Sequence, residues 1–203
     1  GVLARPRAVR RNCYHGLGHG VLGNIGYDEE SLQQGLEICS GADLQLQQPH
    51  CWAGVFMEYN ARFLLHAPDI YSNDPRPLGD DPFAPCNEVD EKYKETCYFW
   101  QPDWWKVVYE RDFQKVADLC SQVPSMFEQA CHEGLGKTVV WFVPNDITRL
   151  KNVCSLTSEK RQELWCLAEG AESIYLRTKD LSLARSVCEE LTGDDKASCL
   201  MNI

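Results

Sequence analysis

The chain has 203 residues, of which 44% are hydrophobic and 25% are charged, a balance typical of a globular protein rather than a disordered one. Its formal net charge of −10 argues against a nucleic-acid surface or an anionic membrane face, because both kinds of surface require basic patches. No apolar run reaches the roughly 18 residues that a membrane-spanning helix needs. The chain is therefore expected to neither bind nucleic acid nor insert into a membrane.

The first ordered pattern is CYHGLGHGVLGN, residues 13–24, which favours a helix despite the glycines at positions 16, 18 and 20. His15 and His19 are four residues apart and therefore share one face of that helix. Met57 and Glu58 lie at the corresponding place in the next repeat, and His132 with Glu133 lie further along. This pattern indicates a metal site as an alternative hypothesis, with His–Met suited to copper and His–Glu to zinc. The other interpretation is that the histidines hydrogen-bond within a crowded repeat interface.

Four short segments then share one design, in which apolar residues at helical spacing lead to a cysteine. Three of them read DFQKVADLC, DITRLKNVC and DLSLARSVC, and each begins with an aspartate eight residues before its cysteine. Asp112, Asp146 and Asp180 are predicted to cap the amino ends of these helices. ESLQQGLEIC, ending at Cys39, is a looser copy with Ser31 in the capping place.

The segment APDIYSNDPRPLGDDPFAP, residues 67–85, interrupts this pattern. Its five prolines and four aspartates predict a loop, and loops of this length in compact domains are often functional. Asp74, Asp80 and Asp81 offer calcium ligands, but the spacing of an EF-hand is absent. A surface loop that covers one edge of the domain or contacts a partner is the favoured interpretation.

A second irregular place is CYFWQPDWWKVVYERD, residues 97–112. Trp100 stands where other repeats carry glycine, and Pro102 is expected to interrupt the helix. Aromatic side chains provide large contact areas and often anchor binding partners. The predicted binding residues are Trp52, Tyr59, Trp100, Trp104 and Trp105. The alternative is that these rings fill the core of a repeat whose first helix is degenerate.

The segment CHEGLGKTVVWF, residues 131–142, contains GLGKT and so raises the question of a phosphate-binding loop. Such a loop requires an earlier glycine at the position that Cys131 occupies, and a buried strand before it. The preceding residues contain no such strand, and the text from Pro124 to Phe142 predicts a single helix instead. Gly134, Gly54 and Gly16 each follow a cysteine by three residues, which predicts close helix–helix packing at that position.

The eleven cysteines have regular spacing. Ten of them form five groups with ten or eleven residues between the two members, namely Cys39 and Cys51, Cys86 and Cys97, Cys120 and Cys131, Cys154 and Cys166, and Cys188 and Cys199. The first members of the last four groups are 34 residues apart each time. A fixed period of this length is the sequence signature of a helical repeat array.

These spacings are unlike zinc knuckles and suit a disulfide that joins the two helices of each hairpin. Stable disulfides imply an oxidising compartment, so the chain is expected to be secreted or periplasmic. Buried thiols in a cytosolic repeat protein are the alternative. Cys13 remains unpaired, because its expected partner would lie near residue 2. The first hairpin therefore looks truncated, and either a missing helix or an intermolecular partner is expected for Cys13.

The pattern D-x₇-C before a turn, followed by C-x-x-G at the head of the next helix, resembles the Sel-like subclass of tetratricopeptide repeats. The similarity is closest to secreted, disulfide-stapled cysteine-rich repeat proteins and covers residues 28–203. The segment between the cysteines is longer than that family's usual one, and the W-x₂-L-G-x₂-Y signature is absent. The resemblance implies an α-solenoid that binds proteins or peptides on a concave face.

The sequence therefore predicts an all-α fold, a right-handed α-solenoid of about five hairpins in one domain spanning residues 1–203. The expected function is a non-enzymatic binding or assembly scaffold outside the cytoplasm, with a protein or peptide partner and no cofactor. The acidic balance favours a partner with a basic surface, and self-association is the structural version of the same idea. The alternative is a metal-binding or metal-dependent enzyme domain that uses His15, His19 and Glu58.

Overall fold

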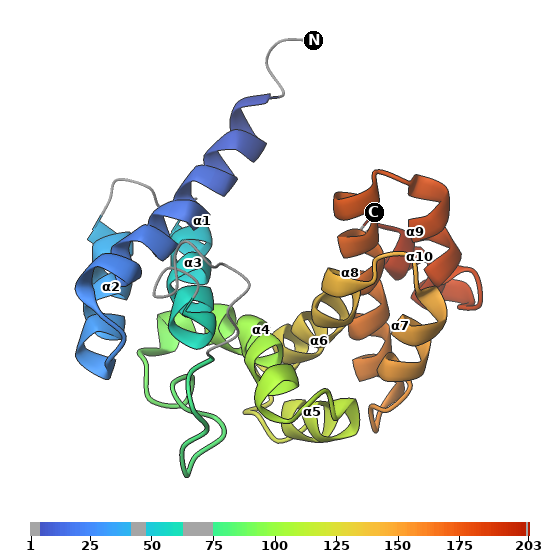
Figure 1. Ribbon diagram of the computed structural model, residues 1–203. Helices are drawn as coiled ribbons and strands as arrows, with labels where there is room; N and C mark the ends of the chain where they lie inside the picture. The colour runs from blue at the N-terminus through green and yellow to red at the C-terminus, as the bar shows by residue number, and fades with distance from the viewer. Residues whose placement is uncertain (1–4, 42–47, 63–74, 202) are drawn as a thin grey trace. The chain divides into compact units, whose positions relative to one another are not determined.

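The computed structural model describes residues 5–41, 48–62, 75–201 and 203, and the described part of the chain is all-α, with no strand. The helices are α1 (Arg5–Ile25), α2 (Glu29–Gly41), α3 (Gln48–Ala61), α4 (Glu91–Val108), α5 (Phe113–Cys120), α6 (Glu128–Phe142), α7 (Ile147–Cys154), α8 (Lys160–Thr178), α9 (Leu181–Cys188) and α10 (Gly193–Met201). Figure 1 shows short and long helices alternating from α5 to α9, and α10 is again short. The predicted fold class, all-α, is confirmed.

The chain divides into two compact units, residues 1–100 and residues 101–203. In the first unit, α1 and α2 both pack against α3. In the second unit, α6 and α8 pack directly against each other, and the short helices α7 and α9 pack against α8. Helix α4 begins in the first unit and ends in the second. That the whole chain is a single domain stays a prediction.

The three short helices α5, α7 and α9 begin as the aspartate pattern predicts. Asp112, Asp146 and Asp180 each precede the first helical residue, and each carboxylate accepts a hydrogen bond from the backbone N–H three residues later. The donor–acceptor distances are 3.0, 2.9 and 2.9 Å. A cap of this kind stabilises a helix by about 1 kcal/mol, which matters for helices of only eight residues. These predicted caps are confirmed.

The cap of α2 differs from the prediction. The helix begins at Glu29, and the Asp28 carboxylate accepts the backbone N–H of Ser31 at 2.7 Å. Ser31 lies in the first turn, where its hydroxyl donates to the carbonyl of Ile25 at 3.3 Å. Asp28 performs the role assigned to Ser31, because it is the residue before the first helical turn and its carboxylate reaches an unpaired N–H of that turn.

Five disulfides join the cysteine pairs that the sequence spacing groups together. The bridges are Cys39–Cys51, Cys86–Cys97, Cys120–Cys131, Cys154–Cys166 and Cys188–Cys199. Their Cα–Cα distances lie between 5.4 and 5.8 Å, within the normal range for a disulfide. Cys13 is unbridged and exposed. Four bridges connect a short helix to the longer helix that follows it, while Cys86 lies in a turn before α4 rather than in a helix.

Two pairs of long helices approach each other at glycines. A Cβ atom on Gly18 of α1 would lie 2.1 Å from the carbonyl oxygen of Cys51 in α3, and one on Gly136 of α6 would lie 2.0 Å from the carbonyl oxygen of Cys166 in α8. Gly54 faces the backbone of α1 with equal closeness. The predicted packing role is therefore confirmed for Gly54 and wrong for Gly16, which has open space around it. The neighbouring Gly18 faces α3 instead.

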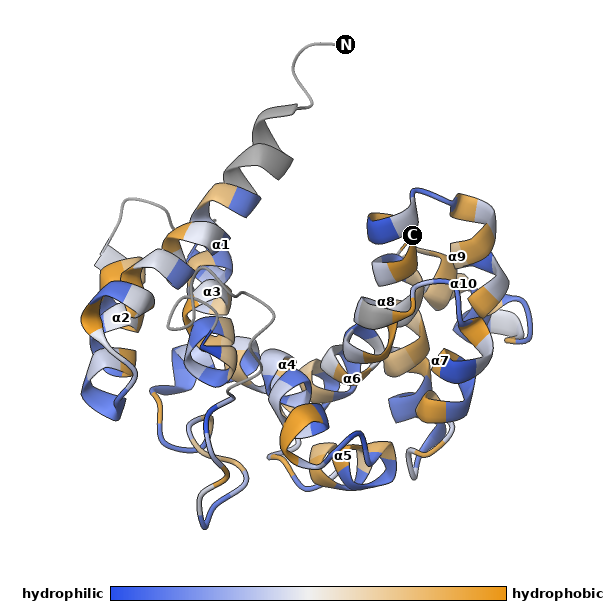
Figure 2. Ribbon diagram, viewed as in Figure 1, coloured by the Kyte–Doolittle hydropathy of each residue, from blue (hydrophilic) through white to orange (hydrophobic). Residues whose placement is uncertain are grey.

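Apolar residues gather on one side of each short helix. In α5 the buried residues are Phe113, Val116, Ala117, Leu119 and Cys120, which recur at helical spacing. Figure 2 shows the same division into apolar and polar sides along α5 and α7. The buried sides pack against the long helices α6 and α8, so the core of the second unit lies between the short and the long helices.

Two predictions about helix limits are wrong. Helix α6 begins at Glu128 rather than at Pro124, because residues 124–127 form a turn in which the N–H of Phe127 donates to the carbonyl of Pro124 at 2.8 Å. Helix α4 continues through Pro102 to Val108 without ending there. A proline in a long helix removes one hydrogen bond, and packing on both sides of it compensates for that loss.

The predicted loop at 67–85 lies partly outside the described residues, which resume at residue 75. From there to residue 90 the chain forms turns and irregular structure, as expected. Arg76 ties this segment to α3, since its guanidinium donates to the side-chain oxygen of Asn60 at 3.2 Å and to the carbonyl of Ala84 at 2.8 Å. The oxygens of Asp81 accept from the N–H of Phe83 and from the side chain of Asn87.

Within the described residues, no helix combines the length and the apolar character that crossing a membrane would require.

Candidate functional site

A polar cluster in the first unit brings together three of the four residues predicted as metal ligands. His19 Nδ1 lies 2.9 Å from Glu58 Oε2, and His19 Nε2 lies 3.3 Å from His15 Nε2. The hydroxyl of Tyr27 donates to Glu58 Oε1 at 2.6 Å. Glu58 is fully buried, so its carboxylate depends on these donors. Tyr27 was not predicted, because nothing in its local sequence links it to residue 58.

The cluster has the geometry of a hydrogen-bonded chain rather than of a metal centre. With both imidazoles neutral, His19 donates through Nδ1 to Glu58 and accepts through Nε2 from His15. Among residues 5–41, 48–62, 75–201 and 203, no group of three or more His, Cys, Asp or Glu side chains is placed to hold a metal ion. Met57 is partly exposed and is not part of this hydrogen-bonded chain.

A second polar cluster joins α4 to α6 inside the second unit. Lys137 forms an ion pair with Asp103 Oδ2, and the hydroxyl of Thr138 donates to Asp103 Oδ1 at 2.8 Å. Lys106 adds a second positive charge, with its Nζ 3.9 Å from Asp103 Oδ1. Lys106, Lys137 and Thr138 are all buried. This arrangement answers the question raised by GLGKT, because both Lys137 and Thr138 bind a carboxylate within a helix and neither is available to a nucleotide.

Burial and charge act against each other in this cluster. Burial works to raise the pKa of Asp103, but the charges of Lys137 and Lys106 and the hydrogen bonds from Lys137 and Thr138 together outweigh it, so the pKa is lowered and the carboxylate is ionised. Burial lowers the pKa of Lys106 to about 8, while Asp103 opposes that change. Burial also lowers the pKa of Lys137, again against the attraction of Asp103. Asp103 is therefore the anion that neutralises two buried ammonium groups.

Glu169 of α8 lies next to this cluster and behaves differently. Burial raises its pKa to about 8, and the neighbouring carboxylates Glu172 and Glu133 add to the increase. Lys137 and the hydroxyl of Ser173, 3.3 Å from Oε1, act in the opposite direction. Glu169 is therefore largely protonated at neutral pH, which reduces the repulsion among three acidic side chains on two packed helices.

The two clusters occupy the same place in the repeat. His19 and Lys137 each lie six residues after the cysteine of their helix, as does Asp103 in α4. Comparison of CYHGLGHG with CHEGLGKT would have indicated this correspondence, since His19 and Lys137 then align directly. Sequence reasoning missed the ion pair because it does not show which neighbouring helix each side chain faces.

His132 of α6 is a third polar group in the core. It is fully buried, and its Nδ1 lies 2.9 Å from the carbonyl oxygen of Glu128 in the preceding turn. Its Nε2 is buried without a hydrogen-bond partner among the described residues. Burial lowers the pKa of His132, so the imidazole is neutral. The ring lies 6.4 Å from that of Trp165, and within the described residues His132 belongs to no group of three or more His, Cys, Asp or Glu side chains placed to hold a metal ion.

Four of the five aromatic residues predicted to bind a partner lie in the core. Trp52 and Tyr59 are 9% and 6% exposed, and Trp104 and Trp105 are 2% and 0% exposed. The indole N–H of Trp52 donates to the hydroxyl of Ser40 at 3.2 Å. A buried ring cannot contact a partner without rearrangement of the core, so binding by these four residues stays a prediction and would require such a rearrangement. They fill a core that the short helices alone leave incomplete.

Trp100 is the exception and is partly exposed. Its ring lies 5.6 Å from the imidazole of His15 and 5.6 Å from the ring of Phe99. This contact places Trp100 against the histidine cluster within the first unit. Trp100 therefore covers His15 on one side, which limits the access of solvent to the hydrogen-bonded chain.

The sequence did not predict a role for Trp141. Its side chain is exposed in the structure, with 41% of its surface accessible. All six tryptophans lie in the described part of the chain, and the other five are buried or partly buried. The guanidinium of Arg177 in α8 lies over the indole, 4.4 Å from its centroid. Leu176, next to Arg177, is 39% exposed. The carboxyl ends of α6 and α8 thus present an apolar and cationic surface, here called the Trp141 surface.

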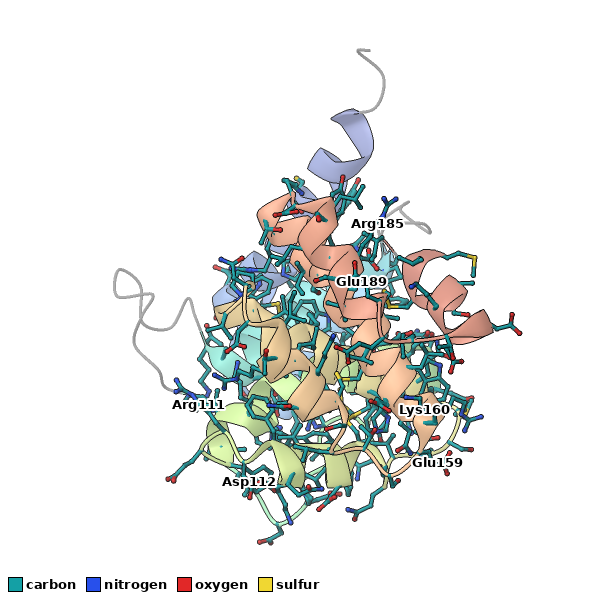
Figure 3. The ribbon with its side chains drawn as sticks, turned by 90° about the vertical axis from the view of Figure 1, so that its right-hand side faces the viewer. Arg111, Asp112, Glu159, Lys160, Arg185 and Glu189 are labelled. Carbon is teal, nitrogen blue, oxygen red and sulfur yellow. A yellow bond between two sulfur atoms is a disulfide. The ribbon has the colours of Figure 1, made fainter. Side chains whose placement is uncertain are left out.

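The remaining surface of the second unit carries charges of both signs. Figure 3 labels three pairs of exposed side chains, each with one acidic and one basic member, namely Arg111 and Asp112, Glu159 and Lys160, and Arg185 and Glu189.

Comparisons with protein-family models, with curated proteins and with solved structures found no match to this chain.

Proposed function

We propose that this chain is a binding scaffold that acts outside the cytoplasm and recognises a protein or peptide partner through the surface of its helical repeats. Five disulfides hold five successive segments, and the buried clusters described above hold the long helices to one another. Such an arrangement gives a rigid framework whose exposed side chains lose little conformational entropy on binding.

The extracytoplasmic location is part of the proposal. Ten of the eleven cysteines are bridged, and disulfides persist in oxidising compartments while cytosolic thiols are kept reduced. Alkylation of the purified chain without reduction tests it. One label for each chain supports the bridged form, and eleven labels would show free thiols and remove the basis for this location.

We further propose that the hairpins stack as a right-handed α-solenoid of the Sel-like kind. In support, the second unit pairs short helices with short helices and long with long, since α5 packs against α7 and α6 against α8. Stacking of equivalent helices is characteristic of helical repeat arrays. Small-angle scattering of the full chain, compared with curves calculated for stacked and unstacked hairpins, checks this proposal.

The main support for the binding proposal is the exposed Trp141 surface. Tryptophan and arginine are the residues most enriched among side chains that dominate binding energy. Trp141 remains 41% exposed although each of the other tryptophans is more buried. An indole held by a cation–π contact with Arg177 is already ordered, so a partner that covers it gains apolar burial at small entropic cost.

The test places a photo-crosslinking residue at position 141 in the oxidised full-length chain. The matched control carries the same residue at position 38, where Ile38 is 44% exposed in the first unit. In extract from the protein's own extracytoplasmic compartment, we expect an adduct at position 141. An excess of unlabelled wild-type chain should suppress this adduct, whereas an excess of the Trp141→Ala variant should not. Equal suppression by the variant would remove Trp141 from the interface. An adduct between two copies of the chain would make self-association the function of this surface.

A metal-binding function is the second candidate, favoured by the convergence of His15, His19 and Glu58. Zinc or copper at this place would have to displace the hydrogen bond between the two imidazoles. Isothermal titration with each metal tests it, with the double variant His15→Gln/His19→Gln as control. Stoichiometric binding that the control lacks would favour this function, and absence of binding to the wild type would dismiss it.

A further inference from the structure

Helix α1 is a repeat helix of the same kind as α6. When the segments CYHGLGHG and CHEGLGKT are aligned, Cys13 corresponds to Cys131, and the glycine–leucine–glycine run is identical in both. The packing agrees with this alignment, because Gly18 in α1 meets the carbonyl oxygen of Cys51 as Gly136 in α6 meets the carbonyl oxygen of Cys166. Each glycine lies five residues after its cysteine, and each touched cysteine is the second of its pair.

The two helices differ on one face. Cys13, Leu17 and Val21 follow each other at four-residue intervals and therefore lie along one side of α1. Cys13 is exposed, Leu17 is 44% exposed and Val21 is partly exposed. Their counterparts in α6 are Cys131, Leu135 and Val139, which are 0%, 0% and 2% exposed.

Open space continues along this side of α1. A Cβ atom added to Gly16 or to Gly20 would meet no other atom within 4 Å. The residue of α6 that corresponds to Gly20 is Thr138, which is 1% exposed. We call the side of α1 formed by Cys13, Leu17 and Val21 the Cys13 face.

The structure shows what covers the equivalent face elsewhere. The short helix α5 packs against α6, and the disulfide Cys120–Cys131 ties α5 to the residue that corresponds to Cys13. Helix α5 has an aspartate cap, an apolar side that includes Val116 and Leu119, and a cysteine at its last position. The covering element is thus an amphipathic helix of about eight residues that ends in a cysteine.

We propose that the Cys13 face binds a partner helix of this kind, whose cysteine forms a disulfide with Cys13. A second copy of the chain is a poor occupant, because each short-helix cysteine in the described part is already bridged and only Cys13 itself would remain. Continuity of the repeat supports a short helix as well. It would lie beside α2 as α5 lies beside α7.

The covalent step is thiol–disulfide exchange. The Cys13 thiol loses its proton to solvent, and the thiolate attacks the partner cysteine, which carries glutathione as a mixed disulfide. The bond between the partner sulfur and glutathione breaks as the new bond to Cys13 forms, and glutathione leaves as a thiolate. No further oxidant is required, because the mixed disulfide supplies the oxidising equivalent.

The experiment uses the oxidised full-length chain and a peptide with the sequence of residues 112–121, DFQKVADLCS, activated with glutathione at its cysteine. The control peptide carries lysine in place of Val116 and Leu119 and keeps the same cysteine. Intact-mass spectrometry follows adduct formation over time. We expect the amphipathic peptide to react about tenfold faster than the control, the factor that burial of one leucine side chain provides.

A chain variant separates docking from simple thiol reactivity. Leu17→Asp keeps Cys13 but places a charge on the Cys13 face, so the preference between the two peptides should disappear. Equal rates for both peptides with the wild-type chain would overturn the proposal, and so would a preference that survives in Leu17→Asp. Spontaneous formation of a Cys13–Cys13 dimer that blocks the peptide would assign the face to a second copy instead.

This inference rests on the proposed scaffold function, since it names a partner for one of its surfaces, but the two fail separately. Loss of the crosslink at position 141 leaves the peptide reaction untouched. Conversely, equal peptide rates would leave the Trp141 surface as the binding site.

Discussion

The packing of α1 on α3 makes a sharp prediction about two glycines that lie two residues apart. Gly18→Ala should destabilise the first unit, whereas Gly16→Ala should stabilise it. The Cβ atom that alanine adds at position 18 would lie 2.1 Å from the carbonyl oxygen of Cys51 and 2.8 Å from the backbone nitrogen of Val55, while Gly16 has no atom within 4 Å. Both variants change the same residue type in the same helix, so each serves as the control for the other.

The magnitudes follow from two opposing effects. Alanine in place of glycine inside a helix stabilises it by about 1 kcal/mol through its lower conformational entropy in the unfolded chain. At Gly16 this stabilisation is the only effect, because the added Cβ atom meets no neighbouring atom. At Gly18 the helices must separate by about 1 Å to admit the new atom, and because the obstacles are backbone atoms, no rotation of a side chain relieves the contact. Overpacking of this kind costs about 3 kcal/mol, so the net destabilisation is about 2 kcal/mol.

The assay is urea unfolding of each variant in the oxidised state, followed by circular dichroism and by tryptophan fluorescence. We expect the two variants to differ by about 3 kcal/mol in the free energy of unfolding, with the wild type between them. Gly136→Ala should behave like Gly18→Ala in the second unit, because its Cβ atom would lie 2.0 Å from the carbonyl oxygen of Cys166. Equal midpoints for Gly16→Ala and Gly18→Ala would refute the alignment of α1 on α3.

Three further predictions concern the second unit. Lys137→Met should destabilise this unit by about 3 kcal/mol in urea unfolding. This is the lower end for a broken buried ion pair, because the Asp103 side chain keeps 23% of its surface exposed. Adding Asp103→Asn to this variant should then cost little more, and fully additive effects would show that the two residues are not coupled. Glu169 has a folded-state pKa of about 8, above its unfolded value, so its contribution to stability is complete in acid and is lost as the pH rises through 8. Unfolding midpoints measured from pH 5 to pH 9 should therefore decline less in Glu169→Gln than in the wild type, and parallel profiles would contradict the raised pKa. Replacing both Cys188 and Cys199 by alanine should lower stability by roughly 3 kcal/mol in the chain-entropy account, measured by thermal unfolding against the wild type, and an unchanged midpoint would show that α9 and α10 hold together without the bridge.

Local features of this protein were readable from its sequence. The aspartates at 112, 146 and 180 cap their helices as the sequence indicates, because a cap involves a carboxylate and an N–H only three residues away. The grouping of the cysteines was also readable, since the two partners are separated by one turn between two adjacent helices. In both cases the interacting groups are close in the chain, so their geometry follows from local structure.

Exceptions occurred where two local signals competed. Asp28 and Ser31 are both good capping residues, and the position of the first helical turn, not the residue type, decided between them. Pro102 is a helix breaker by its own preference, yet α4 continues through it because packing outweighs a local cost of about 3 kcal/mol. Propensity alone is too weak to settle such positions.

The sequence by itself determined the all-α class, the repeat period, the three aspartate caps of the short helices and the cysteine groups, because each of these depends on residues within about one hairpin of each other. Tertiary structure alone decided which glycines touch a neighbouring helix, which tryptophans are buried, and that Asp103 neutralises Lys137. Those outcomes depend on which face of a helix meets which neighbour, and the same amphipathic pattern is compatible with several choices. The energy of the assembled core selects among them, so the exposed Trp141 and the uncovered Cys13 face became visible only in the folded protein.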